Sequence, residues 1–168
     1  MTRQEFEEKA LEMARTWVGV PFLHNGRTRS QGVDCLGLIV CLLRDCGIPV
    51  PDGDGKAYAP DWYVHTPEER YLSGLLDNGI PVAKEALLPG DVPYFRPGLI
   101  LRSQNETITH GGVWLGDGRF IHSITGRRVE IAELRQRAWV KAYAGAIRVH
   151  PLLHLLGEVP GVVPGTSP

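Results

Sequence analysis

Residues 32–47 read GVDCLGLIVCLLRDCG, and this stretch decides the fold. Between Cys35 and Cys46 the chain is apolar on nearly every side, which predicts a helix buried in the core rather than lying on the surface. Asp34 is placed to cap the N-terminus of this helix, and Gly47 is placed to end it. Other elements are needed to surround such a helix, so the rest of the chain has to supply a core around it.

The segments on either side predict an α+β domain in which helices come first and antiparallel strands follow. Residues 2–18 place apolar side chains at helical spacing, and Thr2 with Glu5 fits a capping box. Irregular loops are expected at 20–33 and 50–66. The remaining elements are expected as a helix at 67–78, strands at 91–95, 108–116, 119–124 and 127–131, a short helix at 131–139 and a strand at 145–149.

The length of 168 residues fits one domain, which we predict over 1–149. The last segment, 150–168, is rich in proline and glycine and is expected to form a tail. Four leucines near its start are candidates to dock on the domain: Leu152, Leu153, Leu155 and Leu156.

Composition excludes several classes of protein. A net charge of −1 and a pI of about 6.6 give no reason to expect nucleic acid as a partner. No apolar run approaches the about 20 residues of a membrane span. Three cysteines cannot form a fully paired disulfide framework, and the first residues are acidic and amphipathic rather than a secretory signal. We therefore expect synthesis and folding in a reducing cytoplasm.

Cys35 is the first candidate for chemistry. A cysteine in the first turn of a helix faces the positive end of the helix dipole, which predicts a depressed thiol pKa and an available thiolate. The alternative is that Cys35 is a small buried residue without a chemical role. Cys41 and Cys46 lie inside and at the end of the same helix, where the dipole does not activate a thiol, so we expect no depressed pKa for either.

Two histidines in the predicted strands are the second candidates. A two-residue turn at Asp117-Gly118 would point His110 and His122 to opposite faces, because side chains alternate along a strand. A three-residue loop with Gly118 as a bulge instead pairs Gly112 with His122 and places both histidines on one face. We predict this second arrangement because it lets the two polar side chains meet.

Two histidines on one face of the sheet, together with Cys35, suit a nucleophilic site. His110 would act as base and acid for Cys35, and His122 would orient the His110 ring. The backbone N–H of Cys35 would help to stabilise an oxyanion, and an acyl-thioenzyme would form and be hydrolysed. Zinc bound by the same residues is the rival interpretation, but the spacing of the two histidines fits no usual zinc pattern. We therefore expect no metal and no cofactor.

Three blocks of sequence resemble the NlpC/P60 family of papain-like cysteine peptidases. They read ARTWVGVPFLHNGRTRSQGVDCLGLIVCLLRDCGI at 14–48, LLPGDVPYF at 87–95 and ITHGGVWLGDGRFIHS at 108–123. The resemblance implies a papain-like fold in which the nucleophile begins a helix packed on an antiparallel sheet. It also implies Cys35 as nucleophile, His110 as base and His122 as orienting residue.

The same resemblance implies a substrate and a set of substrate-binding residues. The family usually cleaves the bond between D-γ-glutamate and a diamino acid in the stem peptides of bacterial peptidoglycan. Asp34 would bind the free amine of the substrate, and Gly111 would line the site. Leu36 and Phe22 stand where the family often has serine and tyrosine, so both positions bear on specificity.

The D-C-L-G-L form and the preceding GRTRSQGV look most like the phage and prophage branch of the family. This likeness implies a tail-associated peptidase, with phage tail proteins as partners and the virion as a location. Two other readings stay open. One is a papain-like amidase or acyltransferase on a non-wall substrate, with a pocket shaped by Tyr58, Trp62 and Tyr63. The other is a structural tail component built on this fold.

Overall fold

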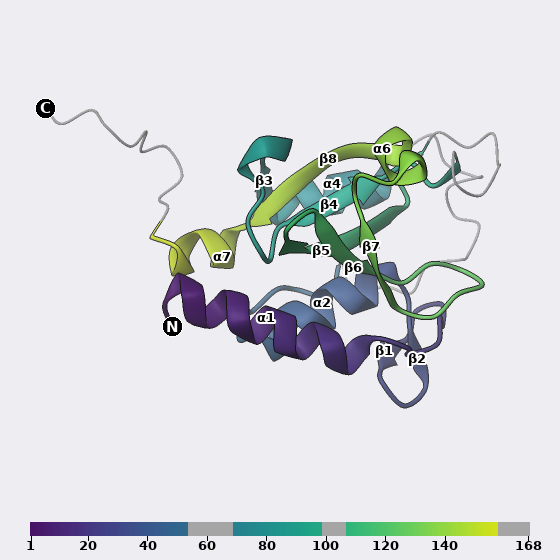
Figure 1. Ribbon diagram of the computed structural model, residues 1–168, viewed down its shortest axis with the longest axis horizontal. Coiled ribbons are helices and arrows are strands. Elements are labelled where there is room, and N and C mark those ends of the chain that lie inside the picture. The colour runs from purple at the N-terminus through teal and green to yellow at the C-terminus, as the bar shows by residue number, and fades with distance from the viewer. Residues whose placement is uncertain (54–68, 99–106, 158–168) are drawn as a thin grey trace, which may run out of the picture.

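The computed structural model describes residues 1–53, 69–98 and 107–157 (Figure 1). Its helices are α1 (Arg3–Trp17), α2 (Cys35–Asp45), α4 (Arg70–Asp77), α6 (Arg137–Ala142) and α7 (His150–Leu155), with a 3₁₀ turn η1 at Lys84–Ala86. Its strands are β1 (Arg27–Thr28), β2 (Gly32–Val33), β3 (Gly79–Pro81), β4 (Val92–Phe95), β5 (His110–Gly116), β6 (Arg119–His122), β7 (Glu130–Glu133) and β8 (Tyr143–Val149). None of the helices in these ranges combines the length and the apolar character needed to cross a membrane.

The sheet confirms the predicted α+β class. Six strands pair in the order β3-β8-β4-β5-β6-β7, and every neighbouring pair is antiparallel. Helices α1 and α2 lie together on one side of this sheet, as Figure 1 shows. The first helix has the predicted capping box, since the Thr2 hydroxyl accepts from the Glu5 amide and the Glu5 carboxylate accepts from the Thr2 amide.

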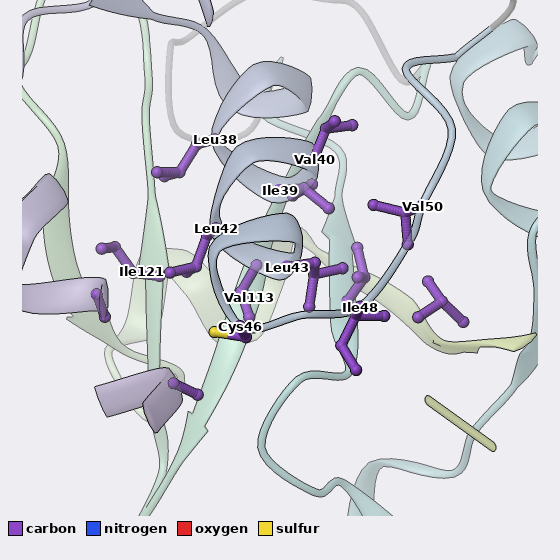
Figure 2. Packing of buried hydrophobic residues seen from close by; sticks show 14 of the residues in the cluster. Leu38, Ile39, Val40, Leu42, Leu43, Cys46, Ile48, Val50, Val113 and Ile121 are labelled. Carbon is purple, nitrogen blue, oxygen red and sulfur yellow. The ribbon is translucent and has the colours of Figure 1, made fainter. Parts of the chain in front are cut away.

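Helix α2 is the centre of the core. Its side chains point in several directions at once, with Leu42 beside Val113 and Ile121 of the sheet and Leu43 beside Ile48 of the following loop (Figure 2). Leu38 and Leu42 are fully buried. The prediction of a helix surrounded by other elements is therefore confirmed.

Asp91 of the LLPGD motif forms a buried ion pair with Arg148 of β8. The Arg148 guanidinium donates to both carboxylate oxygens of Asp91, at 2.8 and 2.9 Å. The same carboxylate accepts from the Leu88 amide at 2.8 Å. Asp91 is fully buried and Arg148 nearly so. These contacts fix the turn that leads into β4, and removing one partner of such a pair leaves an uncompensated buried charge.

The strand predicted at 127–131 is found a few residues later, as β7 at Glu130–Glu133. Residues 127–129 are bonded to the segment 19–22 and not to the main sheet, since Gly19 donates to the Val129 carbonyl and Val129 donates to the Val20 carbonyl. Pairing with β6 begins only at Glu130. The helix expected at 131–139 is accordingly wrong in position, because Glu130–Glu133 is β7 and the helix begins at Arg137.

Smaller differences concern the loops. The loop expected at 20–33 contains the short pair β1 and β2, and strand β3 was not expected. Most of the predicted loop at 50–66, with its three aromatic residues, lies outside the described residues. At the C-terminal end, α7 buries Leu152 and Leu153, and the partly buried Leu155 and Leu156 pack against the same core, so the expectation that the tail leucines dock is confirmed.

Candidate active site

Asp34 holds the N-terminus of α2 in place. Its carboxylate accepts from the amides of Gly37 and Asn25, both at 2.7 Å, and from the Arg27 guanidinium at 3.0 Å. The residue is only 2% exposed. These bonds make Asp34 the N-cap that fixes Cys35 at the first position of the helix. Binding of a substrate amine by Asp34 stays a prediction, and it would require the carboxylate to share or leave these partners.

Cys35 lies against the start of β5. Its thiol donates to the carbonyl oxygen of Thr109, the residue before His110, with a sulfur–oxygen distance of 3.7 Å. The Tyr71 hydroxyl and the backbone amides of Gly111 and Leu36 are the polar groups near the sulfur that lower its thiol pKa. The nucleophile candidate therefore lies beside the strand that carries the base candidate.

The absence of a side chain at Gly111 is what lets this arrangement form. A Cβ atom there would lie 2.6 Å from the Tyr71 hydroxyl oxygen and 3.3 Å from the carbonyl oxygen of Pro93. Any larger residue would displace Tyr71, which approaches Cys35 from α4. Gly111 thus shapes the site by its small size.

The hairpin brings the two histidines together in the predicted register but through a different turn. Gly112 pairs with His122, as expected. The turn itself has two residues, since Asp117 and Gly118 both have positive φ, 51° and 77°. A two-residue turn alone would put His110 and His122 on opposite faces. The register shift between Trp114 and Gly116 brings the two histidines back to the same face.

The histidine pair is in direct contact. Nε2 of His110 lies 3.3 Å from Nδ1 of His122. Trp139 of α6 covers both rings, stacked on His110 with centroids 5.8 Å apart and edge-on to His122 at 4.6 Å. Both histidines are buried, His122 completely. Aromatic cover of this kind keeps water away from the bond between the two rings.

Burial sets the protonation of the pair. It lowers the pKa of His110 well below the ordinary value of 6.5, and the neighbouring charge of His122 acts in the same direction. It also lowers the pKa of His122 to about 4, although the carboxylate of Glu130 opposes this fall. Both rings are therefore neutral at pH 7.

The expected depression of the Cys35 pKa is wrong. Burial raises the pKa of the Cys35 thiol to about 12, and the negative charge of Asp34 adds to the rise. Hydrogen bonds from Tyr71, Gly111 and Leu36 favour the thiolate without overcoming these effects. The helix dipole cannot compensate for desolvation next to the capping carboxylate. Burial therefore opposes charge on both the Cys35 thiol and the His110 ring.

The other two cysteines behave as predicted in one respect. Burial raises the pKa of Cys46 to about 11, and burial also raises the pKa of Cys41. Neither thiol has a depressed pKa, so that part of the expectation is confirmed.

The remaining predicted positions, Phe22 and Leu36, lie close to Cys35 in the chain or in space. Phe22 forms a bridge to Val33, two residues before Cys35, and is partly buried. Leu36 and Tyr71 line one side of a cavity of about 340 Å³ between α2, α4 and the sheet. Most of its other lining side chains are apolar, Val92 and Ile147 among them. Leu36, which follows Cys35 in the chain, therefore lines a pocket whose wall is mostly apolar but also includes the charged residues Arg27, Asp52, Arg70 and Asp77.

Three neighbours of the site were not predicted: Tyr71, Glu130 and Trp139. Tyr71 lies within the predicted helix at 67–78, but nothing in its local spacing indicates contact with Cys35. Trp139 was placed at the end of a helix that the structure moves. In the described residues, no group of three or more histidine, cysteine or acidic side chains is arranged to hold a metal ion.

A helix that begins with a cysteine, packed on an antiparallel sheet that carries two histidines, defines a papain-like class of fold. Residues 19–148 match the model of the NlpC/P60 family. The chain belongs to this family of cysteine peptidases.

Curated relatives with this similarity are named as a gamma-DL-glutamyl hydrolase, a murein endopeptidase and a probable endopeptidase. The chain is 28% identical over 174 residues to the gamma-DL-glutamyl hydrolase of Bacillus subtilis (strain 168), covering 94% of this chain and 37% of that protein. It is 28% identical over 148 residues to the murein DD-endopeptidase MepH of Escherichia coli (strain K12), covering 87% and 47%. It is 27% identical over 138 residues to the probable endopeptidase NlpC of the same strain, covering 82% and 75%. The chain thus spans less than half the length of two of these relatives.

Solved structures support the fold. An NlpC/P60 family protein from Bacillus cereus ATCC 10987 is 26% identical with a TM-score of 0.61, over 85% of this chain and 40% of that one. RipD from Mycobacterium tuberculosis, a non-catalytic NlpC/p60 domain protein adapted to peptidoglycan binding, is 18% identical with a TM-score of 0.53, over 86% and 97%. At that identity the likeness concerns the fold alone.

Proposed function

We propose that this chain is a cysteine peptidase that hydrolyses an amide bond in bacterial cell-wall peptides, the bond between D-γ-glutamate and a diamino acid. The observation that carries the proposal is the position of Cys35 against the start of the strand that carries His110. The Cys35 thiol reaches the backbone just before His110, and the far nitrogen of His110 contacts His122. The names of the relatives, wall endopeptidases and a gamma-glutamyl hydrolase, support the substrate class.

The proposed reaction starts from the neutral pair. As the Cys35 sulfur attacks the peptide carbonyl, His110 takes the thiol proton, so that a free thiolate is not needed beforehand. The carbonyl oxygen becomes an oxyanion, for which the Cys35 backbone N–H is the proposed donor. His110 then gives its proton to the leaving amine, and the C–N bond breaks to leave a thioester on Cys35.

Water completes the cycle. His110 removes a proton from a water molecule as its oxygen attacks the thioester carbonyl. The C–S bond breaks, and the proton returns to the Cys35 sulfur. The products are a peptide that ends in the γ-carboxylate of D-glutamate and a peptide with a free diamino-acid amine. His122 keeps the His110 ring in the orientation that both transfers require.

The experiment is a digestion of the tripeptide L-Ala-γ-D-Glu-meso-diaminopimelate and of purified peptidoglycan, followed by mass spectrometry of the products. The proposal predicts L-Ala-D-Glu and free diaminopimelate from the tripeptide. Intact tripeptide together with uncut peptidoglycan, under conditions where the protein is folded, would refute it.

A second candidate function is acyl transfer or amide hydrolysis on a substrate with an apolar chain. The apolar cavity beside Leu36 and Tyr71 is the observation that favours it. Thioester and amide substrates with medium-length acyl chains would test it. Faster release from these than from the wall tripeptide would place this function first.

Location on a phage tail is a separate proposal that rests on the D-C-L-G-L pattern. A peptidase acting in a virion needs a retained Cys35, whereas a structural tail component does not. Particles assembled with the Cys35→Ala protein would carry it in either case. Loss of wall penetration by those particles would indicate catalysis, and normal penetration would indicate a structural role.

A further inference from the structure

A carboxylate lies behind the histidine pair. Glu130 is the cross-strand partner of His122 in the pairing of β6 with β7, so both side chains emerge on the same face. Its Oε1 atom is 3.6 Å from Nε2 of His122. We propose that Glu130 is a positioning residue that fixes the protonation of His122 and, through it, the reactive nitrogen of His110. This inference rests on the proposed function of Cys35 and His110.

The surroundings of His122 leave it one candidate acceptor. Its Nδ1 faces His110, and its Nε2 is buried with no hydrogen-bond partner within 3.5 Å among the described residues. The charged groups that face this ring are Glu130 and, behind it, Arg127. Arg127 donates to Glu130 at 3.0 Å and lies further out in solvent. The carboxylate of Glu130 is therefore the group that can accept a hydrogen bond from a protonated Nε2 of His122.

Tautomers connect these contacts. His110 can act as a base toward Cys35 only if its Nδ1 is unprotonated, because its Nε2 is turned toward His122. A neutral His110 of this kind carries its proton on Nε2 and donates it to Nδ1 of His122. His122 then has to carry its own proton on Nε2, which points to Glu130. Each step follows from the one before, since a neutral imidazole has one donor and one acceptor.

The carboxylate also acts on charge. When His110 takes the thiol proton, an imidazolium forms in a buried, aromatic environment where positive charge is disfavoured. Glu130 partly offsets this cost, as its upward effect on the pKa of His122 indicates. The side chain is 41% exposed, so water and Arg127 weaken the effect. We expect a moderate contribution to rate rather than an absolute requirement.

The test combines a structural and a kinetic readout on Glu130→Ala, Glu130→Gln and the control Glu133→Ala. Glu133 lies on the same strand but pairs with Arg135 and faces Arg119 across the sheet, away from the histidines. In protein labelled with ¹⁵N-histidine, nitrogen chemical shifts report which ring nitrogen of His122 carries the proton. Hydrolysis of L-Ala-γ-D-Glu-meso-diaminopimelate gives kcat and KM.

We expect the Nε2-protonated form of His122 in the native protein and in Glu133→Ala. Glu130→Ala should shift His122 toward the Nδ1-protonated form and lower kcat about tenfold, with KM changed by less than about twofold. Glu130→Gln should keep the native tautomer, because its amide oxygen still accepts.

An unchanged His122 tautomer in Glu130→Ala would overturn the inference, as would a native His122 protonated on Nδ1. If the native protein hydrolyses no wall peptide, the proposed function fails. The nitrogen shifts of His122 then still decide the role of Glu130. The two failures are therefore distinguishable.

Discussion

The buried His122 makes a prediction about stability that needs no substrate. Its pKa falls from 6.5 to about 4 on folding, mainly through burial. Below pH 6.5 the unfolded chain takes up a proton that the folded chain does not, so stability is highest above pH 6.5 and falls toward pH 4. The full difference corresponds to about 3 kcal/mol, of which about 2 kcal/mol is lost at pH 5. The lowered pKa of His110 adds a loss of the same sign.

Guanidinium unfolding at pH 7.5 and pH 5.0 measures this directly. The native protein should lose about 2 kcal/mol more between the two pH values than His122→Asn, in which the titrating ring is replaced by an uncharged polar group. His154→Asn is the matched control, because it makes the same substitution at an exposed histidine instead of a buried one. An equal loss of unfolding free energy in the native protein and in His122→Asn would show that the buried His122 does not set the pH dependence of stability.

Three further substitutions test the surroundings of Cys35. Asp34→Ala should lower the free energy of unfolding by about 3 kcal/mol, because it removes the helix cap and a partner of Arg27. Asp34→Asn should lower it by less. A loss below about 1 kcal/mol for Asp34→Ala would contradict this prediction. Gly111→Ala should destabilise by about 1–2 kcal/mol in the same assay and displace Tyr71, and an unchanged free energy would count against the close contact. Tyr71→Phe should slow iodoacetamide alkylation of Cys35 at a fixed pH, because it removes a hydroxyl that favours the thiolate. An unchanged alkylation rate would show that the hydroxyl has no such effect.

Local patterns were enough to predict the elements that carry the site. The apolar run at 35–46 and the cap at Asp34 depend on neighbouring residues, and both are present as expected. The pairing of Gly112 with His122 was also predictable, since it is the register that places both polar histidines on one face. The turn itself was not, because a bulge near Gly116 and a two-residue turn produce the same pairing as a three-residue loop.

Contacts between distant segments account for the errors. Residues 127–129 bond to 19–22, more than 100 positions earlier, which no local pattern records. Tyr71 and Glu130 reach the site from an unpredicted direction for the same reason. The Cys35 pKa was predicted from the helix dipole alone, whereas burial and the charge of Asp34 dominate in the folded protein. Burial is a property of the whole fold, so a single helix N-terminus cannot reveal it.

The proposal that Cys35 is the nucleophile can be tested by measuring cleavage of L-Ala-γ-D-Glu-meso-diaminopimelate by Cys35→Ala and by Cys41→Ala. Both cysteines lie on α2 and both have raised pKa values, but only Cys35 lies beside the histidine strand. The account predicts no detectable cleavage by Cys35→Ala and a near-native rate for Cys41→Ala. Cleavage by Cys35→Ala at the native rate would contradict it.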